Sequence, residues 1–353
     1  MYRTKIKVVL SVVWIVLSLS ACHREQPFSQ TFLQFGTLIN VTLYTSSPHL
    51  AMDAFAQIDS YLSKRHTDWH SWLEGDLYHF NQALAHNPGQ WVDIPPSLTL
   101  LIDQSQHYFQ RSNGRFNPAL GKLVAAWGFH QNSQPDTALI STIQQSIPRM
   151  DQLIINAGRA QSENPHLQLD FGGIAKGLAV AEIRSLLEEN NIHNFIVNAG
   201  GDLTTSGHKP GQPWRIAIEN PFKEGIIATL ELSGQHAVFT SGNYRRQFKD
   251  KGQPMRHHII DPLSGQPSKF ISSATVHHDD PVRADAAATA LMLTQPQNLS
   301  TVATRMGVHD FLVITNNGDV LYSPSFVDQL QWAEGNQLNR HQINTSGIHP
   351  NPE

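Results

Sequence analysis

The sequence predicts an α+β protein in which a mixed, largely antiparallel sheet packs against helices, with a helix-rich N-terminal lobe. Segments with apolar residues three and four positions apart dominate the first half of the chain, and short β-rich runs dominate the second half. A chain of 353 residues that is 40% hydrophobic is long enough to bury one large core or two smaller ones.

The N-terminal half is expected to be mostly helical. Residues 31–45 are β-rich and broken near Gly36. Apolar spacing then predicts helices at 50–64, 76–85, 97–111 and 118–127. Asn117 and Pro118 suit an N-cap followed by proline at the first helical position of the last of these helices.

The C-terminal half is expected to contain most of the strands. Helices are predicted at 174–189 and 283–293. Strands are predicted at 151–156, 166–170, 194–202, 214–219, 227–232, 236–240, 256–260, 271–277, 310–315 and 319–322. The folded domain is therefore assigned to residues 31–330, and the polar residues 331–353 are expected to form a loose tail.

The first 22 residues resemble a bacterial lipoprotein signal. A positively charged start precedes Val8–Leu19, an apolar run of twelve residues that is short for a membrane span. Small residues then precede Cys22, which is expected to become the lipidated first residue, with 23–30 as a tether. The alternative is an ordinary buried cysteine behind an uncleaved anchor. Because His23 replaces the aspartate of inner-membrane retention signals, the expected location is the periplasmic face of a membrane, preferably the outer one.

The composition argues against nucleic acid as a partner and against a disulfide. The formal net charge is −4 and no basic stripe is present, so nucleic acid is an unlikely partner. Cys22 is the only cysteine, which excludes a disulfide within the chain.

The stretch LDFGGIAKG, residues 169–177, predicts an anion site at the start of a helix. Gly172 and Gly173 allow close approach of a ligand to the backbone, and Lys176 adds a positive charge. Asp170 is placed at the end of a strand, where it can accept from a ligand N–H or hydroxyl. The spacing fits neither a P-loop nor a dinucleotide fingerprint. A tight turn with a solvated lysine is the alternative.

The stretch ADAAATAL, residues 284–291, suits a hard metal ion. A helix places Asp285 and Thr289 on one face, and the small alanines between them allow close packing. Carboxylate and hydroxyl oxygens suit Mg²⁺ when phosphates and water complete its shell. Alternatively, Asp285 complements the helix dipole and Thr289 bonds to the backbone.

Two histidine-containing segments are ambiguous. His258 opens the run HIIDPLSG, where it can act on a proton or a phosphate or be a half-buried structural residue. Asp261 begins a turn signal in the same run. The group 277–280, HHDD, is interpreted as a polar loop before Pro281 in preference to a transition-metal site.

Together and in order, five segments resemble the ApbE-type FAD:protein FMN transferases. The matching blocks are Asp170–Gly177 (DFGGIAKG), Asn198–Asp202 (NAGGD), Thr240–Arg245 (TSGNYR), His258–Gly265 (HIIDPLSG) and Ala284–Leu291 (ADAAATAL). Weaker similarity at 35–41 and 114–129 extends the resemblance to about residues 32–322. Members of this family are typically lipoproteins, which agrees with Cys22.

The resemblance implies an ApbE-like fold and transfer of FMN from FAD to a threonine hydroxyl of a protein, with release of AMP and with Mg²⁺ on the diphosphate. The implied acceptors are periplasm-facing flavoprotein subunits of sodium-pumping NADH:quinone reductase or Rnf-type complexes. Two alternatives remain: a Mg²⁺-dependent FAD pyrophosphatase that uses water as acceptor, and a non-catalytic FAD-binding lipoprotein.

The resemblance also implies roles for individual residues. Gly173, through its carbonyl, Asp285 and Thr289 are the expected metal ligands. His258, Asp261 and Lys176 are the catalytic candidates, with His258 preferred for the proton of the attacking threonine. The expected FAD-binding residues are Phe35, Asn117, Asp170, Gly172, Gly173, Lys176, Gly200, Ser241 and Ile259. Phe35 stands where the family has methionine, and segment 60–81 is longer than usual, with Trp72 as the candidate for stacking on the flavin.

Overall fold

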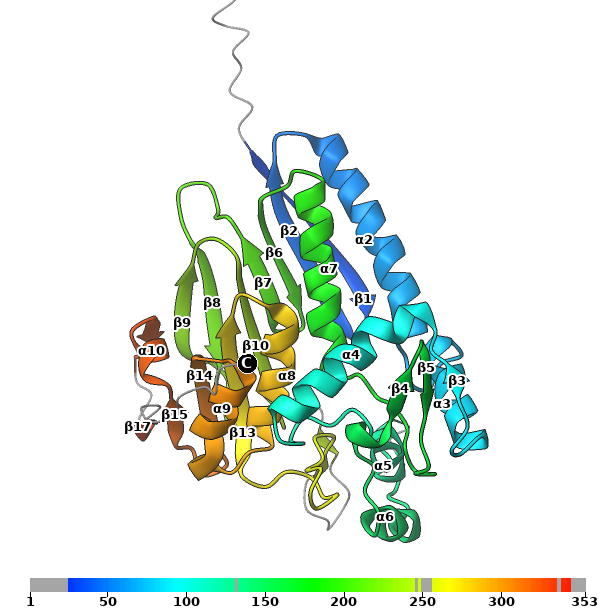
Figure 1. Cartoon of the computed structure of the whole chain (residues 1–353). Helices are drawn as coiled ribbons and strands as arrows, with labels where there is room; N and C mark the ends of the chain where they lie inside the picture. Colours follow the sequence, from blue (N-terminus) through cyan, green and yellow to red (C-terminus); the bar gives the residue numbers. More distant parts are fainter. Residues whose placement is uncertain (1–24, 131–132, 245–246, 249–255, 335–337, 344–353) are drawn as a thin grey trace, which may run out of the picture.

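A large sheet forms the centre of the molecule (Figure 1). The structure is a computed structural model that describes residues 25–130, 133–244, 247–248, 256–334 and 338–343. Within these residues the sheet has nine strands in the order β1-β2-β6-β7-β10-β13-β14-β15-β17. All neighbouring strands are antiparallel except the parallel pair β15–β17, so the predicted largely antiparallel sheet is confirmed.

The strands of this sheet are β1 Gln26–Gln34, β2 Thr37–Thr45, β6 Asn194–Ala199, β7 Asp202–Ser206, β10 His236–Gly242, β13 Ile271–His278, β14 Asp310–Thr315, β15 Val320–Tyr322 and β17 Arg340–Gln342. The predicted break near Gly36 is the turn of the β1–β2 hairpin. Phe35 and Gly36 both have positive φ, 53° and 67°, as the two central residues of a type I′ turn require.

Helices cover one face of the sheet, and most begin where the sequence predicts. The long helices are α2 Pro48–Asp68, α3 Asp76–His86, α4 Pro96–Arg111, α7 Ala175–Glu189 and α8 Pro281–Met292. Local capping explains two of the starts. The Ser47 hydroxyl accepts from the N–H of Leu50 at the start of α2, and the Asp280 carboxylate accepts from the N–H of Val282 at the start of α8.

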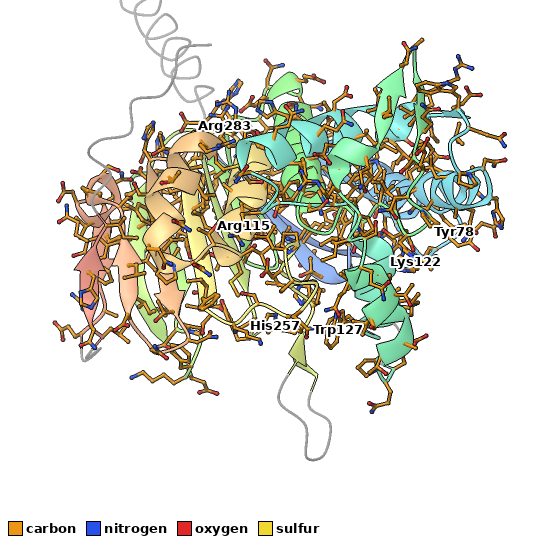
Figure 2. The ribbon with its side chains drawn as sticks, turned by 60° about the horizontal axis from the view of Figure 1, so that its bottom comes forward. Tyr78, Arg115, Lys122, Trp127, His257 and Arg283 are labelled. Atoms are coloured by element: carbon orange, nitrogen blue, oxygen red, sulfur yellow. The ribbon has the colours of Figure 1, made fainter. Side chains whose placement is uncertain are left out.

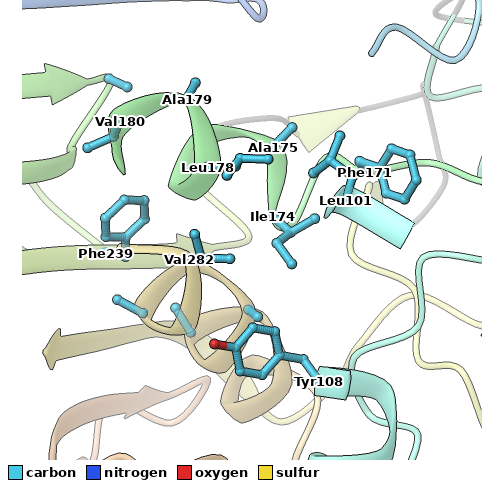
Figure 3. Close-up of a cluster of buried hydrophobic side chains, with 14 of the residues drawn as sticks. Leu101, Tyr108, Phe171, Ile174, Ala175, Leu178, Ala179, Val180, Phe239 and Val282 are labelled. Atoms are coloured by element: carbon cyan, nitrogen blue, oxygen red, sulfur yellow. The ribbon is translucent and has the colours of Figure 1, made fainter. Parts of the chain in front are cut away.

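Helices α7 and α8 pack side by side on the sheet, with α8 against β10 and β13 (Figure 1). Figure 3 shows Leu178 of α7, Val282 of α8 and Phe239 of β10 in one buried cluster. A Cβ at Gly177 would lie 2.7 Å from the Pro281 carbonyl oxygen and 2.8 Å from Asp285 Cβ. Glycine at 177 therefore permits the close approach that brings the DFGG turn to the ADAAAT helix.

A smaller sheet covers the opposite face. It has the order β16-β9-β8, with β8 Trp214–Glu219, β9 Ile226–Leu232 and β16 Leu330–Trp332. Its apolar residues form a second core with Leu203, Val238, Leu312 and Ile314 of the large sheet. The prediction of a loose tail is wrong for residues 331–332 and 340–342, because β16 pairs with β9 and β17 pairs with β15. Residues 344–353 lie outside the described part of the chain.

Several local predictions are wrong for identifiable reasons. The helix predicted at 118–127 is only α5 Gly121–Ala126, because the Asn117 side chain accepts from the N–H of Ala119 in a turn before the helix. Residues 166–170 contain one isolated bridge, Leu120 to Gln168, instead of a strand. Asp170 therefore lies in a loop and not at a strand end. The strand predicted at 256–260 is reduced to β12 Arg256–His257.

The remaining elements are short. They are β3 Val92–Asp93, α6 Thr137–Gln144, the 3₁₀ helix Met150–Gln152, β4 Ile154–Asn156, β5 Arg159–Gln161, β11 Gln247–Phe248, the 3₁₀ helix Pro296–Asn298, α9 Leu299–Met306 and α10 Pro324–Val327. Strands β3, β5 and β4 form a separate small sheet near α3 and α5 (Figure 1).

The helix-rich N-terminal half shares its core with the sheet. One cluster of buried apolar residues runs from Phe32 of β1 through α2, α4 and α7 to Val313 of β14. Across the described residues, the helices are too short or too polar to cross a membrane.

Candidate active site

The centre of the site is the carboxylate of Asp285 on α8. Only 2% of this residue is exposed, and its Oδ2 accepts from the N–H of Gly177 at 2.7 Å, across 108 positions of sequence. Burial raises the pKa of Asp285 to about 6, and Asp202 acts in the same direction, while Lys176 and the Gly177 N–H oppose them. A buried carboxylate of this kind needs positive charge around it.

Lys176 supplies part of that charge and links two acids. Its Nζ lies 2.6 Å from Asp202 Oδ2 and 3.7 Å from Asp285 Oδ1. The other oxygen of Asp202 accepts from the N–H of Thr240 at 2.9 Å. The lysine is three-quarters buried, so the alternative of a solvated lysine is wrong. Asp202 was not among the residues predicted for the site, although its position after a double-glycine turn was a usable signal.

Thr289 lies one helical turn after Asp285 and faces the DFGG turn. Its hydroxyl is 3.2 Å from that of Ser241 at the end of β10. A Cβ at Gly173 would lie 3.0 Å from Thr289 Oγ1 and 3.3 Å from the ring of Phe116. The structure thus brings Gly173, Ser241, Asp285 and Thr289 together, although they come from three distant segments.

The DFGG turn is held by its own aspartate. Asp170 Oδ1 accepts from the N–H of Gly172 at 3.1 Å and from the hydroxyl of Ser71 at 3.3 Å. Ile174 precedes α7 without capping it through its side chain. The N–H groups of Ile174 and Ala175 donate to the Phe171 carbonyl, and that of Gly177 donates to Asp285, so the start of α7 is joined both to the DFGG turn and to α8.

The segment with His258 joins β12 to β13. The run HIIDPLSG follows β12, and Ile259 is buried in the main core. Asp261 is used structurally, since its carboxylate accepts from Leu263 N–H and Ser264 Oγ and lies 3.5 Å from Arg115 Nη1. His258 is half-buried, and its Nδ1 is enclosed. Of the two residues predicted to handle a proton, His258 fits that role better.

Residues 114–129 contact both the DFGG turn and the HIIDPLSG turn. Phe116 contacts the DFGG turn, while Trp127 Nε1 donates to the Gly265 carbonyl in the HIIDPLSG turn. Figure 2 labels Trp127 and His257 at the same edge of the molecule in that view. Asn117 serves local structure, since its amide donates to the Pro148 carbonyl in addition to accepting from Ala119.

The geometry agrees with a known family. Residues 35–312 match the ApbE family. The chain belongs to the ApbE family. It is 36% identical to an FAD:protein FMN transferase of Rhodobacter capsulatus over 311 residues, which cover 87% of this chain and 59% of that protein. The chain therefore spans about three fifths of the length of that relative. It is 28% identical to an FAD:protein FMN transferase of Vibrio cholerae, covering 88% of this chain and 97% of that protein.

Solved ApbE structures share the fold. The ApbE protein of Thermotoga maritima superposes with a TM-score of 0.77 at 25% identity, covering 86% of this chain and 99% of that one. The flavin transferase ApbE of Vibrio cholerae gives a TM-score of 0.75 at 25% identity, with the same coverage. The ApbE-like α+β fold expected from the sequence is confirmed.

A row of aromatic rings borders the site on the side of the β1–β2 hairpin. The Phe35 ring lies 5.7 Å from that of His66 and 6.0 Å from that of Trp69. Trp72, the candidate for stacking on the flavin, stacks instead on His130 at 5.1 Å. The segment that carries Trp72 also carries Ser71, so the enlarged region 60–81 reaches the DFGG turn.

Gly200 fixes the turn that precedes Asp202. Its φ is 68°, and a Cβ there would lie 2.1 Å from Thr37 Oγ1, so glycine is required. Its N–H donates to the Leu38 carbonyl, which ties the turn to the β1–β2 hairpin. Cys22 and Arg245 lie outside the described residues.

The donor set fits a hard divalent cation. Asp285 and Thr289 place a carboxylate and a hydroxyl one turn apart on α8, the Thr289 hydroxyl lies beside Gly173, and Asp285 is buried. In the described part of the chain, no group of three or more His, Cys, Asp or Glu side chains forms a metal site. A cation here would therefore draw further ligands from a substrate, which is typical of Mg²⁺ on phosphates.

Proposed function

We propose that this protein transfers the FMN part of FAD to a threonine hydroxyl of an acceptor protein and releases AMP. The observation that carries the proposal is the meeting of Asp285 and Thr289 with the start of α7, where Gly177 N–H bonds Asp285. A helix start, a buried lysine and hard oxygen ligands suit a diphosphate. The relatives named FAD:protein FMN transferase support a flavin dinucleotide as its source.

The reaction is a phosphoryl transfer. The threonine oxygen forms a bond to the FMN-side phosphorus, and the bond from that phosphorus to the bridging oxygen breaks. The electron pair leaves with AMP, while the hydroxyl proton leaves the threonine. Negative charge grows on the bridging oxygen, so catalysis depends on positioning and charge neutralisation.

Residues of this chain supply both the positioning and the charge neutralisation. The ammonium group of Lys176 at the start of α7 stabilises the diphosphate, and Asp202 and Asp285 hold Lys176 in place. When bound by Asp285, Thr289 and the Gly173 carbonyl, Mg²⁺ would neutralise phosphate charge and act as a Lewis acid. Ser241 fixes the Thr289 hydroxyl. His258 takes the proton from the acceptor threonine.

The proposed location is the periplasmic face of a bacterial membrane, preferably the outer membrane, through lipid on Cys22. This part rests on the sequence alone. The proposed acceptors are periplasm-facing flavoprotein subunits of the sodium-pumping NADH:quinone reductase or Rnf type. An exported acceptor suits an enzyme anchored on that side.

Incubation of the purified protein with FAD, Mg²⁺ and such a subunit tests the proposal. Flavin fluorescence that stays with the acceptor band in an acidified denaturing gel is the expected result. Flavin found only as free FMN would indicate a pyrophosphatase, and FAD that stays bound without turnover would indicate a binding protein. Asp53→Asn, at an exposed position on α2, serves as the control for Asp285→Asn.

A further inference from the structure

An open groove lies at the end of the two sheets, next to the site. Its volume is about 1040 Å³, and residues 219–226, which connect β8 to β9, form one wall. Asn243 and Tyr244, which follow β10, and Ser272 at the start of β13 form the other. His257, which Figure 2 labels beside Trp127, also lines this groove.

His257 contributes a buried acceptor atom to the groove. Only 7% of this residue is exposed, and its Nε2 lies 2.8 Å from the Ser268 carbonyl oxygen. A carbonyl only accepts, so Nε2 carries the proton, and burial lowers the pKa of the ring and keeps it neutral. Nδ1 is therefore a lone-pair acceptor, and no described residue gives it a hydrogen-bond partner. A buried acceptor without a hydrogen bond costs folding free energy, unless a ligand supplies an N–H or O–H.

The groove combines an exposed aromatic side chain with charges that cancel. Phe222 in the wall is 52% exposed. The charged lining residues are Glu219, Lys223, Glu224 and Lys269, two of each sign. An exposed aromatic side chain in one groove with a buried hydrogen-bonding group is typical of polypeptide recognition, and a balanced charge does not favour a diphosphate.

The residues of the groove and of the reaction centre are neighbours in sequence. His257 is followed directly by His258, and Asn243 comes two residues after Ser241, which contacts Thr289. A polypeptide in the groove would therefore lie within a few residues of the place where its hydroxyl must meet the phosphorus.

We infer that this groove binds an extended, uncharged segment of the acceptor protein next to the modified side chain. A main-chain N–H or a hydroxyl of that segment donates to His257 Nδ1, and an apolar side chain of the segment covers Phe222. His257 is then an acceptor-binding residue and takes no part in proton transfer. The inference rests on the proposed function, because it locates the second substrate of that reaction.

Two substitutions of His257 test the roles of its two nitrogen atoms separately. His257→Gln can keep a donor to the Ser268 carbonyl but has no acceptor at the Nδ1 position, whereas His257→Asn places its carbonyl oxygen near that position. With the soluble domain of the flavin-bearing subunit of a sodium-pumping NADH:quinone reductase as acceptor, His257→Gln should raise the acceptor KM about three- to tenfold. The kcat and the FAD KM should stay unchanged, and His257→Asn should recover part of the loss. A rise in the FAD KM, or no change in either KM, would overturn the inference.

Direct binding in the absence of FAD tests the role of Phe222. Phe222→Ser should weaken binding of the same fluorescently labelled domain about three- to tenfold in anisotropy titrations. Leu100→Ser removes an exposed leucine of similar size on α4 and should leave the Kd within about twofold. Equal effects of the two substitutions, or no binding by the unaltered protein, would overturn the inference. Loss of self-association in Phe222→Ser would also overturn it, because that result would assign the groove to a second copy of this chain.

The two proposals can fail separately. If the protein binds the acceptor through Phe222 but flavinylates nothing, the groove stands and the proposed transfer is wrong. If flavinylation proceeds and neither substitution affects the acceptor, the transfer stands and the groove is wrong.

Discussion

At the scale of single residues, the site depends on charges that are held in a buried place. Asp285 is 2% exposed and has one N–H donor and one lysine within 4 Å. An ionised carboxylate in such surroundings costs folding free energy, and burial accordingly raises its pKa to about 6. Residues that carry such a cost are typical of functional sites.

Asp285→Asn should therefore separate activity from stability. The amide keeps the shape and an acceptor for the Gly177 N–H but removes the charge that a cation needs. We expect flavin transfer to fall about 100- to 1000-fold, while the melting temperature without FAD and Mg²⁺ is unchanged or higher. A variant that unfolds at a clearly lower temperature would show that the carboxylate stabilises the fold.

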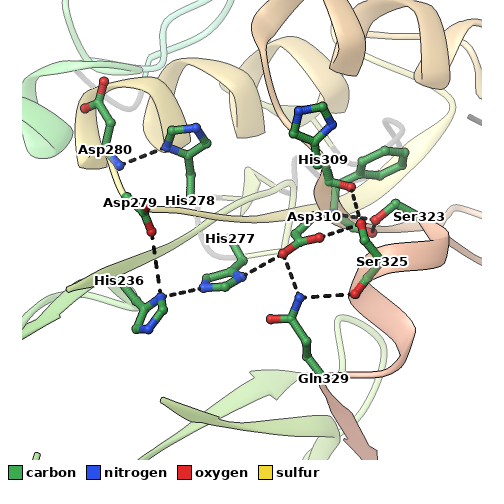
Figure 4. Close-up of polar contacts among 11 residues, drawn as sticks. His236, His277, His278, Asp279, Asp280, His309, Asp310, Ser323, Ser325 and Gln329 are labelled. Atoms are coloured by element: carbon green, nitrogen blue, oxygen red, sulfur yellow. Dashed lines mark hydrogen bonds and ion pairs between the residues drawn. The ribbon is translucent and has the colours of Figure 1, made fainter. Parts of the chain in front are cut away.

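A second polar cluster, formed around His277 and Asp310, joins strands instead (Figure 4). His277 Nδ1 lies 3.1 Å from Asp310 Oδ2, and its Nε2 lies 3.1 Å from His236 Nδ1. Asp310 also accepts from Ser325 and Gln329. Burial alone would raise the pKa of Asp310, but these hydrogen bonds and the attraction of His277 outweigh it and hold the pKa at about 2.

The low pKa of Asp310 makes the stability of the fold depend on pH. The pKa of Asp310 is lower in the folded protein than its ordinary value of 3.8, so its contribution to stability is present above about pH 4 and is lost as the pH falls towards 2. Because the group is only half-buried, we expect Asp310→Asn to cost about 1 kcal/mol at pH 5 and little at pH 2.5. Urea unfolding at both pH values measures this, with the exposed Asp103→Asn as control. Equal costs at the two pH values would contradict it.

At the scale of elements, the contact between α7 and α8 determines whether the site forms. A Cβ at 177 would lie within 3.0 Å of Pro281, Asp285 and Val282. Two of these contacts are to backbone atoms, which cannot rotate away.

Gly177→Ala should thus destabilise the protein by about 1 to 3 kcal/mol despite the higher helix propensity of alanine. It should also lower transfer, because Asp285 must move. Ser185→Ala on the exposed face of α7 controls for the propensity gain and should be neutral or slightly stabilising. Denaturant titrations of both variants decide, and a Gly177→Ala protein as stable as Ser185→Ala would refute the close packing.

The sequence predicted the elements that local rules determine. Helix α2 and strand β8 follow from apolar spacing and alternation, and strand β8 lies where it was predicted, at 214–219. The prediction was wrong where a side chain competes with the backbone, as Asn117 does before α5. It was also wrong at β16, which pairs with β9 about 100 residues earlier, because pairing over such distances has no local signature.

Part of the site was also predictable from local sequence patterns. Asp285 and Thr289 share a helix face, and Lys176 follows a double glycine, so their chemistry could be inferred from spacing. Asp202 was missed although it follows a double-glycine turn, because its role arises from the contact with Lys176 across the α7–β7 packing. The structural use of Asp261 likewise depends on Arg115, which is remote in sequence.

At the scale of the whole molecule, the large sheet separates two cores with different tasks. The helix-covered core carries α7 and α8 and hence the site. The second core closes only when residues after 330 return to β9, so the C-terminal strands are part of the fold.

Leu330→Ala tests that closure. Leu330 is 8% exposed in the second core, whereas its neighbour Gln331 points to solvent. We expect a loss of about 2 to 3 kcal/mol for Leu330→Ala and less than about 0.5 kcal/mol for Gln331→Ala in chemical denaturation. Similar small values for both would show that β16 adds little to the fold.

The central claim is that Asp285, Thr289 and the start of α7 form a centre that moves FMN from FAD to a protein hydroxyl. Intact-mass analysis of the acceptor, combined with quantification of AMP, tests it most directly. The account predicts that each acceptor gains one FMN less one water, with one AMP released per acceptor, and that Asp285→Asn slows the appearance of both signals about 100- to 1000-fold. AMP and free FMN formed with an acceptor of unchanged mass, or a fully active Asp285→Asn protein, would contradict it.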